Sequence, residues 1–166
     1  MRDGFNFIER DSCVIMDIRE AFSMKESYKK ILVAVDGSPA STDAFNEALN
    51  VAERNEAKLF ILTVVDYKFS IGDPAFINDA LKFHLNNAEI ELEQLIANSN
   101  VSKFDYETKI DSGNPKRKII DYALEQQVDL IMLGATGRGA VEQALIGSTT
   151  AYVVNHANCN VMVVKS

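Results

Sequence analysis

The chain has 166 residues, 47% of them hydrophobic and 25% charged, with a formal net charge of -7. This length suits one compact domain with a sizeable core, and the acidic balance argues against nucleic acid or an anionic membrane as the main partner. No apolar run approaches the roughly 20 residues of a membrane helix, and the N-terminal apolar stretch is cut by Asp17 and Arg19. We therefore expect a cytoplasmic protein with neither a membrane span nor a signal peptide.

Residues 1 to 28 stand outside the regular pattern that follows them. Ile15, Ile18 and Phe22 are spaced for a short amphipathic helix. Such a helix would pack as an arm on the domain or on a partner subunit. A loosely ordered extension is the alternative, and both stay open. We treat 1–28 as an extension of unknown role and 29–166 as a single nucleotide-binding domain.

Short apolar runs alternate with helical patterns from Lys30 onward. Continuous apolar runs are typical of strands that are buried on both faces, as in a parallel sheet. The segment 101–110 instead alternates and carries charge, which favours an edge position. The predicted strands are 31–35, 58–65, 101–110, 129–133 and 160–164.

The helix starts are marked by capping residues and prolines. Ser38 followed by Pro39 predicts a helix with a hydroxyl cap and proline at its first position. A long helix should follow Pro74, and the break at 111–115 should cap a third helix. We expect Ser148 to cap the fourth.

Alternating strands and helices predict an α/β domain with a mostly parallel sheet. Because the third strand belongs at an edge, we expect the flavodoxin-like, Rossmann-like order 3-2-1-4-5 with helices on both faces. In such a doubly wound sheet, ligands bind at the carboxyl ends of strands 1 and 4, where the order reverses. Strand 1 ends at Asp36 and strand 4 at Gly134, so these two loops should form the site.

The second of these loops is rich in glycine. Gly134, Gly137 and Gly139 allow close approach of the backbone to a ligand, and Gly147 and Ser148 open a helix whose free N–H groups favour a phosphate. An ordinary loop with incidental glycines is the alternative. The spacing matches neither a P-loop nor the dinucleotide fingerprint.

The spacing Gly134-x2-Gly137-x9-Gly147-Ser148 resembles the ATP-binding signature of the universal stress protein family. The first strand with its Asp-Gly-Ser loop, the second strand and the last strand resemble the same family, so the likeness covers roughly residues 28 to 165. Asn160 departs from the proline that often precedes the last strand in the family. That departure concerns assembly more than ATP.

The resemblance implies an ATP-binding homodimer that pairs through its last strand. It implies that Asp36 meets the ribose or base, that Ala34 lines the base and that the Val64 backbone holds the adenine. The loop would wrap the ribose and phosphates, and Mg²⁺ or Mn²⁺ would bridge phosphate oxygens. The remaining implied binding residues are Gly134, Ala135, Thr136, Gly137, Arg138, Gly139, Gly147, Ser148, Thr149 and Thr150.

Three hypotheses for the function stay open. The first is a nucleotide-dependent stress-response regulator whose state is read by a protein partner of unknown identity. The second is a slow ATPase, for which Glu142 is the only candidate base, so we assign no catalytic residue and expect at most weak hydrolysis. The third is a dimerisation module with an empty pocket. The isolated cysteines and histidines predict no metal site made by protein ligands.

Overall fold

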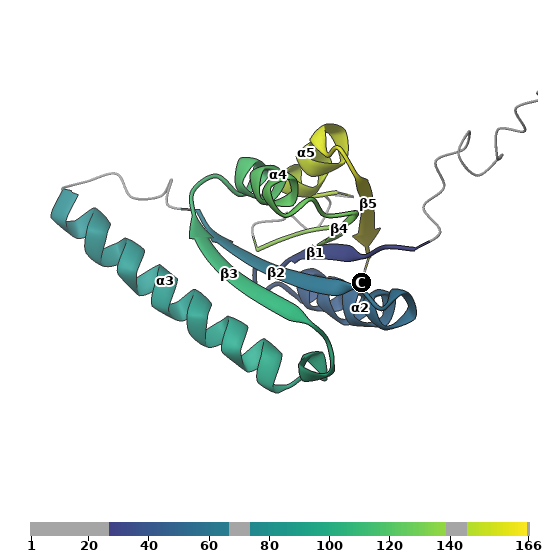
Figure 1. Cartoon of the computed structure of the whole chain (residues 1–166). Coiled ribbons are helices and arrows are strands. Elements are labelled where there is room, and N and C mark those ends of the chain that lie inside the picture. Colours follow the sequence, from purple (N-terminus) through teal and green to yellow (C-terminus); the bar gives the residue numbers. More distant parts are fainter. Residues whose placement is uncertain (1–26, 67–73, 139–145, 166) are drawn as a thin grey trace, which may run out of the picture.

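A computed structural model of the chain describes residues 27–66, 74–138 and 146–165, with side chains in the helix that begins at Pro74 placed from Asn78 onward (Figure 1). Its five strands form one parallel sheet in the order β3-β2-β1-β4-β5, which confirms the predicted doubly wound order. The strands are β1 (Lys30–Ala34), β2 (Lys58–Val65), β3 (Tyr106–Ser112), β4 (Leu130–Gly134) and β5 (Asn160–Val164).

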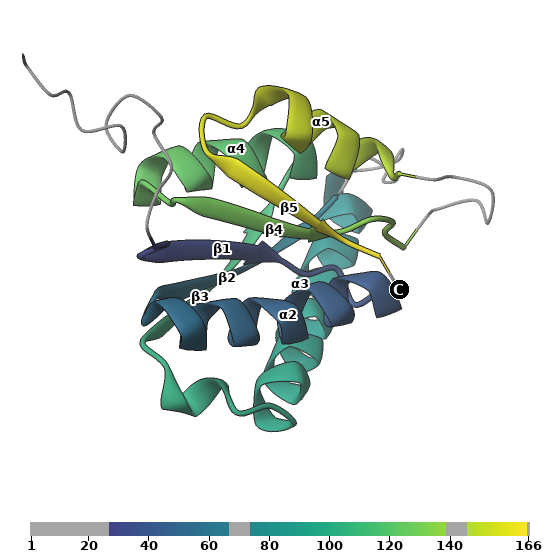
Figure 2. The ribbon, with the colours of Figure 1, turned by 90° about the vertical axis from the view of Figure 1, so that its right-hand side faces the viewer.

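Helices cover both faces of the sheet, as Figure 2 shows. Helices α2 (Pro39–Asn55) and α3 (Pro74–Ala97) lie on one face, and α4 (Pro115–Gln126) and α5 (Ser148–His156) lie on the other. Each face has its own apolar cluster. Phe45 of α2 and Leu92 of α3 belong to the first, and Ile119 of α4 and Val153 of α5 belong to the second.

The central strands are apolar throughout because both of their faces are covered. In β1, Ile31 and Val33 pack into the cluster under α2, whereas Leu32 between them packs into the cluster under α4. All three side chains are fully buried. The period of two therefore divides one apolar run between two cores, as expected for a central parallel strand.

Two predicted helix starts are confirmed by their capping geometry. The Ser38 side chain accepts a hydrogen bond from the Ser41 amide, and Pro39 is the first residue of α2. Asn114 caps α4 in the same way, through a bond from the Lys116 amide, and a proline again follows the cap. These caps satisfy amides that have no partner within the helix.

Two predictions of local structure are wrong. The segment expected as a strand over 101–110 begins with a 3-10 turn (Val101–Lys103), and the strand proper is β3. Val101 is fully buried and Phe104 packs against the same cluster, so their spacing of three marks a turn instead of an alternating strand. The cap of α5 is Gly147, which has no side chain to bond, and Ser148 is already the first helical residue.

Of the predicted extension, only residues 27 and 28 lie among the described residues. Tyr28 packs against the first cluster, and its amide donates to Oδ1 of Asn55 over 3.0 Å. Its hydroxyl accepts from Asn160 at the start of β5 over 3.1 Å. The folded domain thus includes Tyr28.

Candidate functional site

A cavity of about 590 Å³ opens at the carboxyl ends of β1, β2 and β4. It lies where the strand order reverses, between β1 and β4, as the sequence predicts. Eleven of the predicted binding residues line it: Ala34, Asp36, Val64, Gly134, Thr136, Gly137, Arg138, Gly147, Ser148, Thr149 and Thr150. Gly139 and Glu142 lie outside the described residues.

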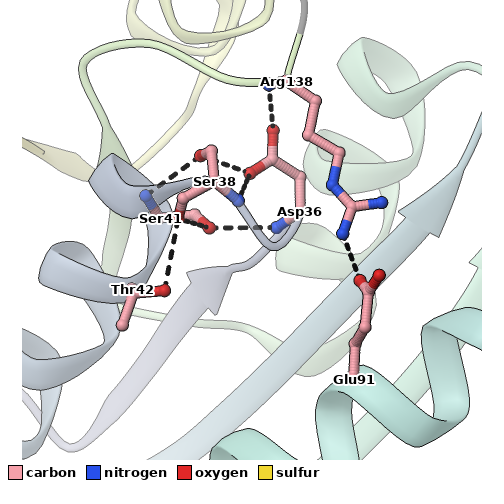
Figure 3. Close-up of polar contacts among 6 residues, drawn as sticks. All are labelled: Asp36, Ser38, Ser41, Thr42, Glu91 and Arg138. Atoms are coloured by element: carbon pink, nitrogen blue, oxygen red, sulfur yellow. Dashed lines mark hydrogen bonds and ion pairs between the residues drawn. The ribbon is translucent and has the colours of Figure 1, made fainter.

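Asp36 lines this cavity and accepts hydrogen bonds from two loops (Figure 3). Its Oδ1 accepts from the amide and the hydroxyl of Ser38 over 3.0 and 2.6 Å. Its Oδ2 accepts from the amide of Arg138 over 3.0 Å, across 102 positions of sequence. The carboxylate therefore ties the loop after β1 to the loop after β4. Oδ2 has only this one partner among the described residues, so a lone pair remains for a hydroxyl group.

These bonds change the acidity of Asp36. Burial by itself would raise the pKa of this carboxyl, but hydrogen bonds from the Ser38 hydroxyl and amide and from the Arg138 amide favour the ionised form and bring the pKa below its ordinary value of 3.8. Asp36 is therefore an anion at neutral pH. It is suited to accept hydrogen bonds and unsuited to act as a general base near pH 7.

Two glycines leave room for this arrangement. A Cβ built on Gly137 would lie 2.5 Å from Oδ2 of Asp36, so a side chain there would displace the carboxylate. Gly37 has a φ of 76°, and a Cβ there would collide with the guanidinium of Arg138. That guanidinium pairs with the carboxylate of Glu91 on α3, as Figure 3 shows.

The end of β4 is packed tightly onto α2 and α5. A Cβ on Gly134 would lie 2.6 Å from the carbonyl carbon of Ala40, which explains glycine at this position without a ligand. The buried hydroxyl of Thr150 donates to the Gly134 carbonyl over 2.8 Å. Ala135 is buried and does not line the cavity. Its amide donates to Val164 of β5, and its carbonyl accepts from the Gly147 amide, each over 2.7 Å.

The N-terminus of α5 forms one wall of the cavity. The first bond of this helix runs from the Ala151 amide to the Gly147 carbonyl over 2.9 Å. The amides of Ser148, Thr149 and Thr150 precede that bond, so helix geometry gives them no intrahelical acceptor. All three residues line the cavity. Gly147 has a φ of -68°, and a Cβ there would lie 3.4 Å from its nearest neighbour, in ordinary contact. The fold therefore does not require a glycine at 147.

The opposite wall is apolar and includes free backbone. Odd-numbered residues of β2 bond to β3, as Leu59 and Val65 show, so the even-numbered ones face β1. The ladder to β1 ends where the Val35 amide donates to the Leu62 carbonyl over 2.9 Å. Val64 lies two residues further along β2, so its backbone groups on that side point past the end of β1 to the cavity that it lines.

Sequence reasoning missed several lining residues, namely Val35, Ser41, Leu62, Pro115, Ile119, Leu133 and Ile146. Leu62 could have been found, because it shares a face with Val64 at a spacing of two. Pro115 and Ile119 begin α4, which the predicted topology already places at this end of the sheet. Ile146 gave no signal, because it is an isolated apolar residue beside a glycine.

Comparisons with known proteins agree with the fold. The chain matches the profile of the Universal stress protein family over residues 27–165. A Staphylococcus aureus (strain USA300) protein whose name places it in this family is 38% identical over an alignment of 148 residues, and the match covers 84% of this chain and 86% of that protein. None of the described helices combines the length and apolar character that crossing a membrane requires.

Solved structures give the same result. The universal stress protein UspA from Lactobacillus plantarum is 39% identical, with a TM-score of 0.76, and the match covers 84% of this chain and 99% of that one. A universal stress protein solved in complex with cAMP is 25% identical, with a TM-score of 0.55 over 84% of this chain and 98% of its own. With a family profile that spans all described residues and relatives near 40% identity, the chain belongs to the universal stress protein family.

Proposed function

We propose that this chain binds an adenine nucleotide, ATP first of all, in the cavity between Asp36 and the N-terminus of α5, and that it acts as a nucleotide-dependent regulator in the stress response. One observation carries the proposal. A cavity of about 590 Å³, within the range of small-molecule sites, joins an apolar wall to three helix amides that have no intrahelical acceptor. An adenine nucleotide has the same division into a flat apolar end and an anionic end.

The adenosine would occupy the apolar side. Ala34, Leu62 and Ile119 line that side, and the backbone of Val64 would hold the edge of the adenine. Asp36 would accept a ribose hydroxyl at Oδ2, which has one protein partner at 3.0 Å and a second lone pair. The contact to the adenine uses the Val64 backbone and the contact to the ribose uses Oδ2 of Asp36, and both residues line the cavity.

The phosphates would lie against the loop and α5. The amides of Ser148 and Thr149, the dipole of α5 and the bare backbone of Gly137 and Gly147 favour an anion at this point. Gly147 supports this placement, because the fold tolerates a Cβ there and a bound phosphate would not. Thr150 would contribute its amide, since its hydroxyl donates to Gly134.

A divalent cation, Mg²⁺ or Mn²⁺, would be bound through the phosphates. Across residues 27–66, 74–138 and 146–165, no cluster of His, Cys, Asp and Glu could hold a metal ion by itself. In this proposal the cation therefore binds together with the nucleotide and screens its charge. The relative in complex with cAMP supports the choice of an adenine nucleotide as the ligand class.

The geometry favours a binding protein over an enzyme. Asp36 is the only acidic residue among the described lining residues, and it already accepts three hydrogen bonds from the protein. General-base catalysis at the terminal phosphate would need a group with a pKa near the operating pH. We therefore propose a regulator that hydrolyses ATP slowly at most, and a dimerisation module without nucleotide is the alternative.

The proposal includes a homodimer that pairs through β5. This strand is bonded to β4 on one side, and no other described strand lies on its far side. Its apolar residues, Val161 to Val164, are only partly covered. An exposed apolar edge is a template for pairing with a second copy. Light scattering of the purified chain tests this: a monomeric mass would contradict it.

The experiment that tests the proposed function begins with the purified, full-length chain. The protein is denatured, and any released nucleotide is identified by chromatography and mass spectrometry. Calorimetry of stripped protein then measures binding of ATP with Mg²⁺, AMP and cAMP. We expect co-purified or added adenine nucleotide at close to one per chain. No released nucleotide and no heat of binding with any of the three would leave the dimerisation module as the better account.

A further inference from the structure

Arg138 belongs to two cavities at once. It lines the proposed nucleotide pocket, and it also lines a second cavity of about 340 Å³ between α2 and α3. Its amide is held by Asp36 in the first, while its guanidinium pairs with Glu91 of α3 at the border of the second (Figure 3). The backbone of Arg138 is therefore fixed and its side chain faces away from the place proposed for the phosphates.

We propose that Glu91 is a selectivity residue that competes with nucleotide phosphates for the Arg138 side chain. Without bound nucleotide, Glu91 holds the Arg138 guanidinium beside Gly37 and away from the phosphate side of the pocket. A nucleotide with several phosphates draws it into the pocket, whereas adenosine leaves it on Glu91. This inference rests on the proposed function and adds a residue outside the pocket to it.

Charge makes this competition effective. Arg138 is the only described lining residue with a positive side chain, and the whole chain has a net charge of -7. Among the described residues that line the pocket, a polyphosphate therefore finds a single cationic side chain. The guanidinium fork bonds phosphate and carboxylate in the same bidentate manner, so the two anions are direct rivals.

The ion pair is weak enough to break. The side chains of Arg138 and Glu91 are 56% and 45% exposed, and exposed pairs stabilise a protein little because water screens them. Only the side chain needs to move, since Asp36 retains the amide. Because Gly37 has no Cβ, it leaves room for the Arg138 guanidinium beside it.

The test compares Glu91→Gln with Glu93→Gln, which removes the same charge from an exposed position on α3 without a contact to Arg138. Calorimetry at low salt measures binding of ATP, AMP and adenosine to the full chain. We expect Glu91→Gln to bind ATP about two- to fivefold more tightly than Glu93→Gln, AMP by less and adenosine equally. In an Arg138→Gln background the gain should vanish.

The outcomes separate this inference from the proposed function. If the wild-type chain binds no nucleotide, both are overturned. If it binds ATP and Glu91→Gln matches Glu93→Gln, the pocket stands and the role of Glu91 is overturned. A gain for Glu91→Gln that persists with Arg138→Gln, or that is equal for adenosine, also overturns it, because the effect would then not pass through the arginine.

Discussion

The amide of Arg138 donates a hydrogen bond to Oδ2 of Asp36 over 3.0 Å and thereby joins two loops that are 102 residues apart in sequence. The same carboxylate accepts two bonds from Ser38. One side chain thus fixes the distance between the end of β1 and the glycine loop after β4. The width of the cavity at the strand-order reversal depends on it, which makes Asp36 the first residue to test.

Asp36→Asn should weaken ATP binding by roughly tenfold. An amide side chain has only one acceptor oxygen, so it cannot serve the donors of Ser38 and of Arg138 together, and a lost bond to a charged group corresponds to about that factor. Calorimetry measures the effect. Asp121→Asn, on the exposed face of α4, is the matched control and should bind as the wild type does. Unchanged ATP affinity in Asp36→Asn would show that the Asp36 carboxylate takes no part in ATP binding.

The stability that Asp36 contributes should depend on pH. Because its folded pKa lies below 3.8, the ionised carboxylate stabilises the fold above the unfolded value, and this contribution is lost as the pH falls through the folded pKa. The difference in free energy of unfolding between wild type and Asp36→Asn should be constant from pH 7 to about 5 and shrink below about 4. Urea titrations at each pH measure it. A difference that stays constant down to pH 2.5 would contradict the depressed pKa.

The sheet order and the place of the cavity follow from the sequence because they depend on patterns that tertiary contacts do not override. Continuous apolar runs such as Ile31 to Val33 have to be buried on both faces, and only a central position offers that. The charged, alternating β3 then has to lie at an edge. With the order known, the reversal point and its two loops follow.

What the sequence could not predict depends on contacts between distant side chains. Thr150 looks like a phosphate ligand by its position, but its hydroxyl donates to Gly134. Arg138 looks like a phosphate contact, but its guanidinium pairs with Glu91, 47 residues earlier. The turn Val101–Lys103 is predicted as a strand from the sequence, because the apolar residues Val101 and Phe104, three positions apart, resemble irregular alternation over so short a segment.

Thr150→Val should lower stability with little effect on the ligand. The buried Thr150 hydroxyl donates to the Gly134 carbonyl over 2.8 Å, and its loss should cost about 1 kcal/mol of unfolding free energy. ATP affinity should stay within about twofold, since the amide remains. Thr150→Ser keeps the hydroxyl and is the control. A tenfold loss of ATP affinity in the valine variant at unchanged stability would contradict this prediction and show that the hydroxyl binds the phosphates.

Gly134 and Gly147 share one sequence signature, but their substitutions should change different properties, stability for Gly134 and ATP affinity for Gly147. Gly134→Ala places a Cβ 2.6 Å from the backbone of Ala40, so overpacking should cost about 1–3 kcal/mol of stability. Gly147→Ala meets nothing closer than 3.4 Å in the chain at an ordinary φ, so its thermal midpoint should stay close to that of the wild type. Its methyl group would instead occupy the approach to the α5 amides and weaken ATP binding by roughly tenfold or more.

Thermal unfolding without ligand and calorimetry with ATP separate the two glycine effects. Gly134→Ala should shift the first measurement, and Gly147→Ala should shift only the second. If Gly147→Ala binds ATP as the wild type does, the phosphates do not lie against this helix N-terminus, because a bound anion in contact with those amides leaves no room for the added methyl group. The glycine would then reflect loop geometry alone, and the nucleotide site would have to lie elsewhere along the cavity.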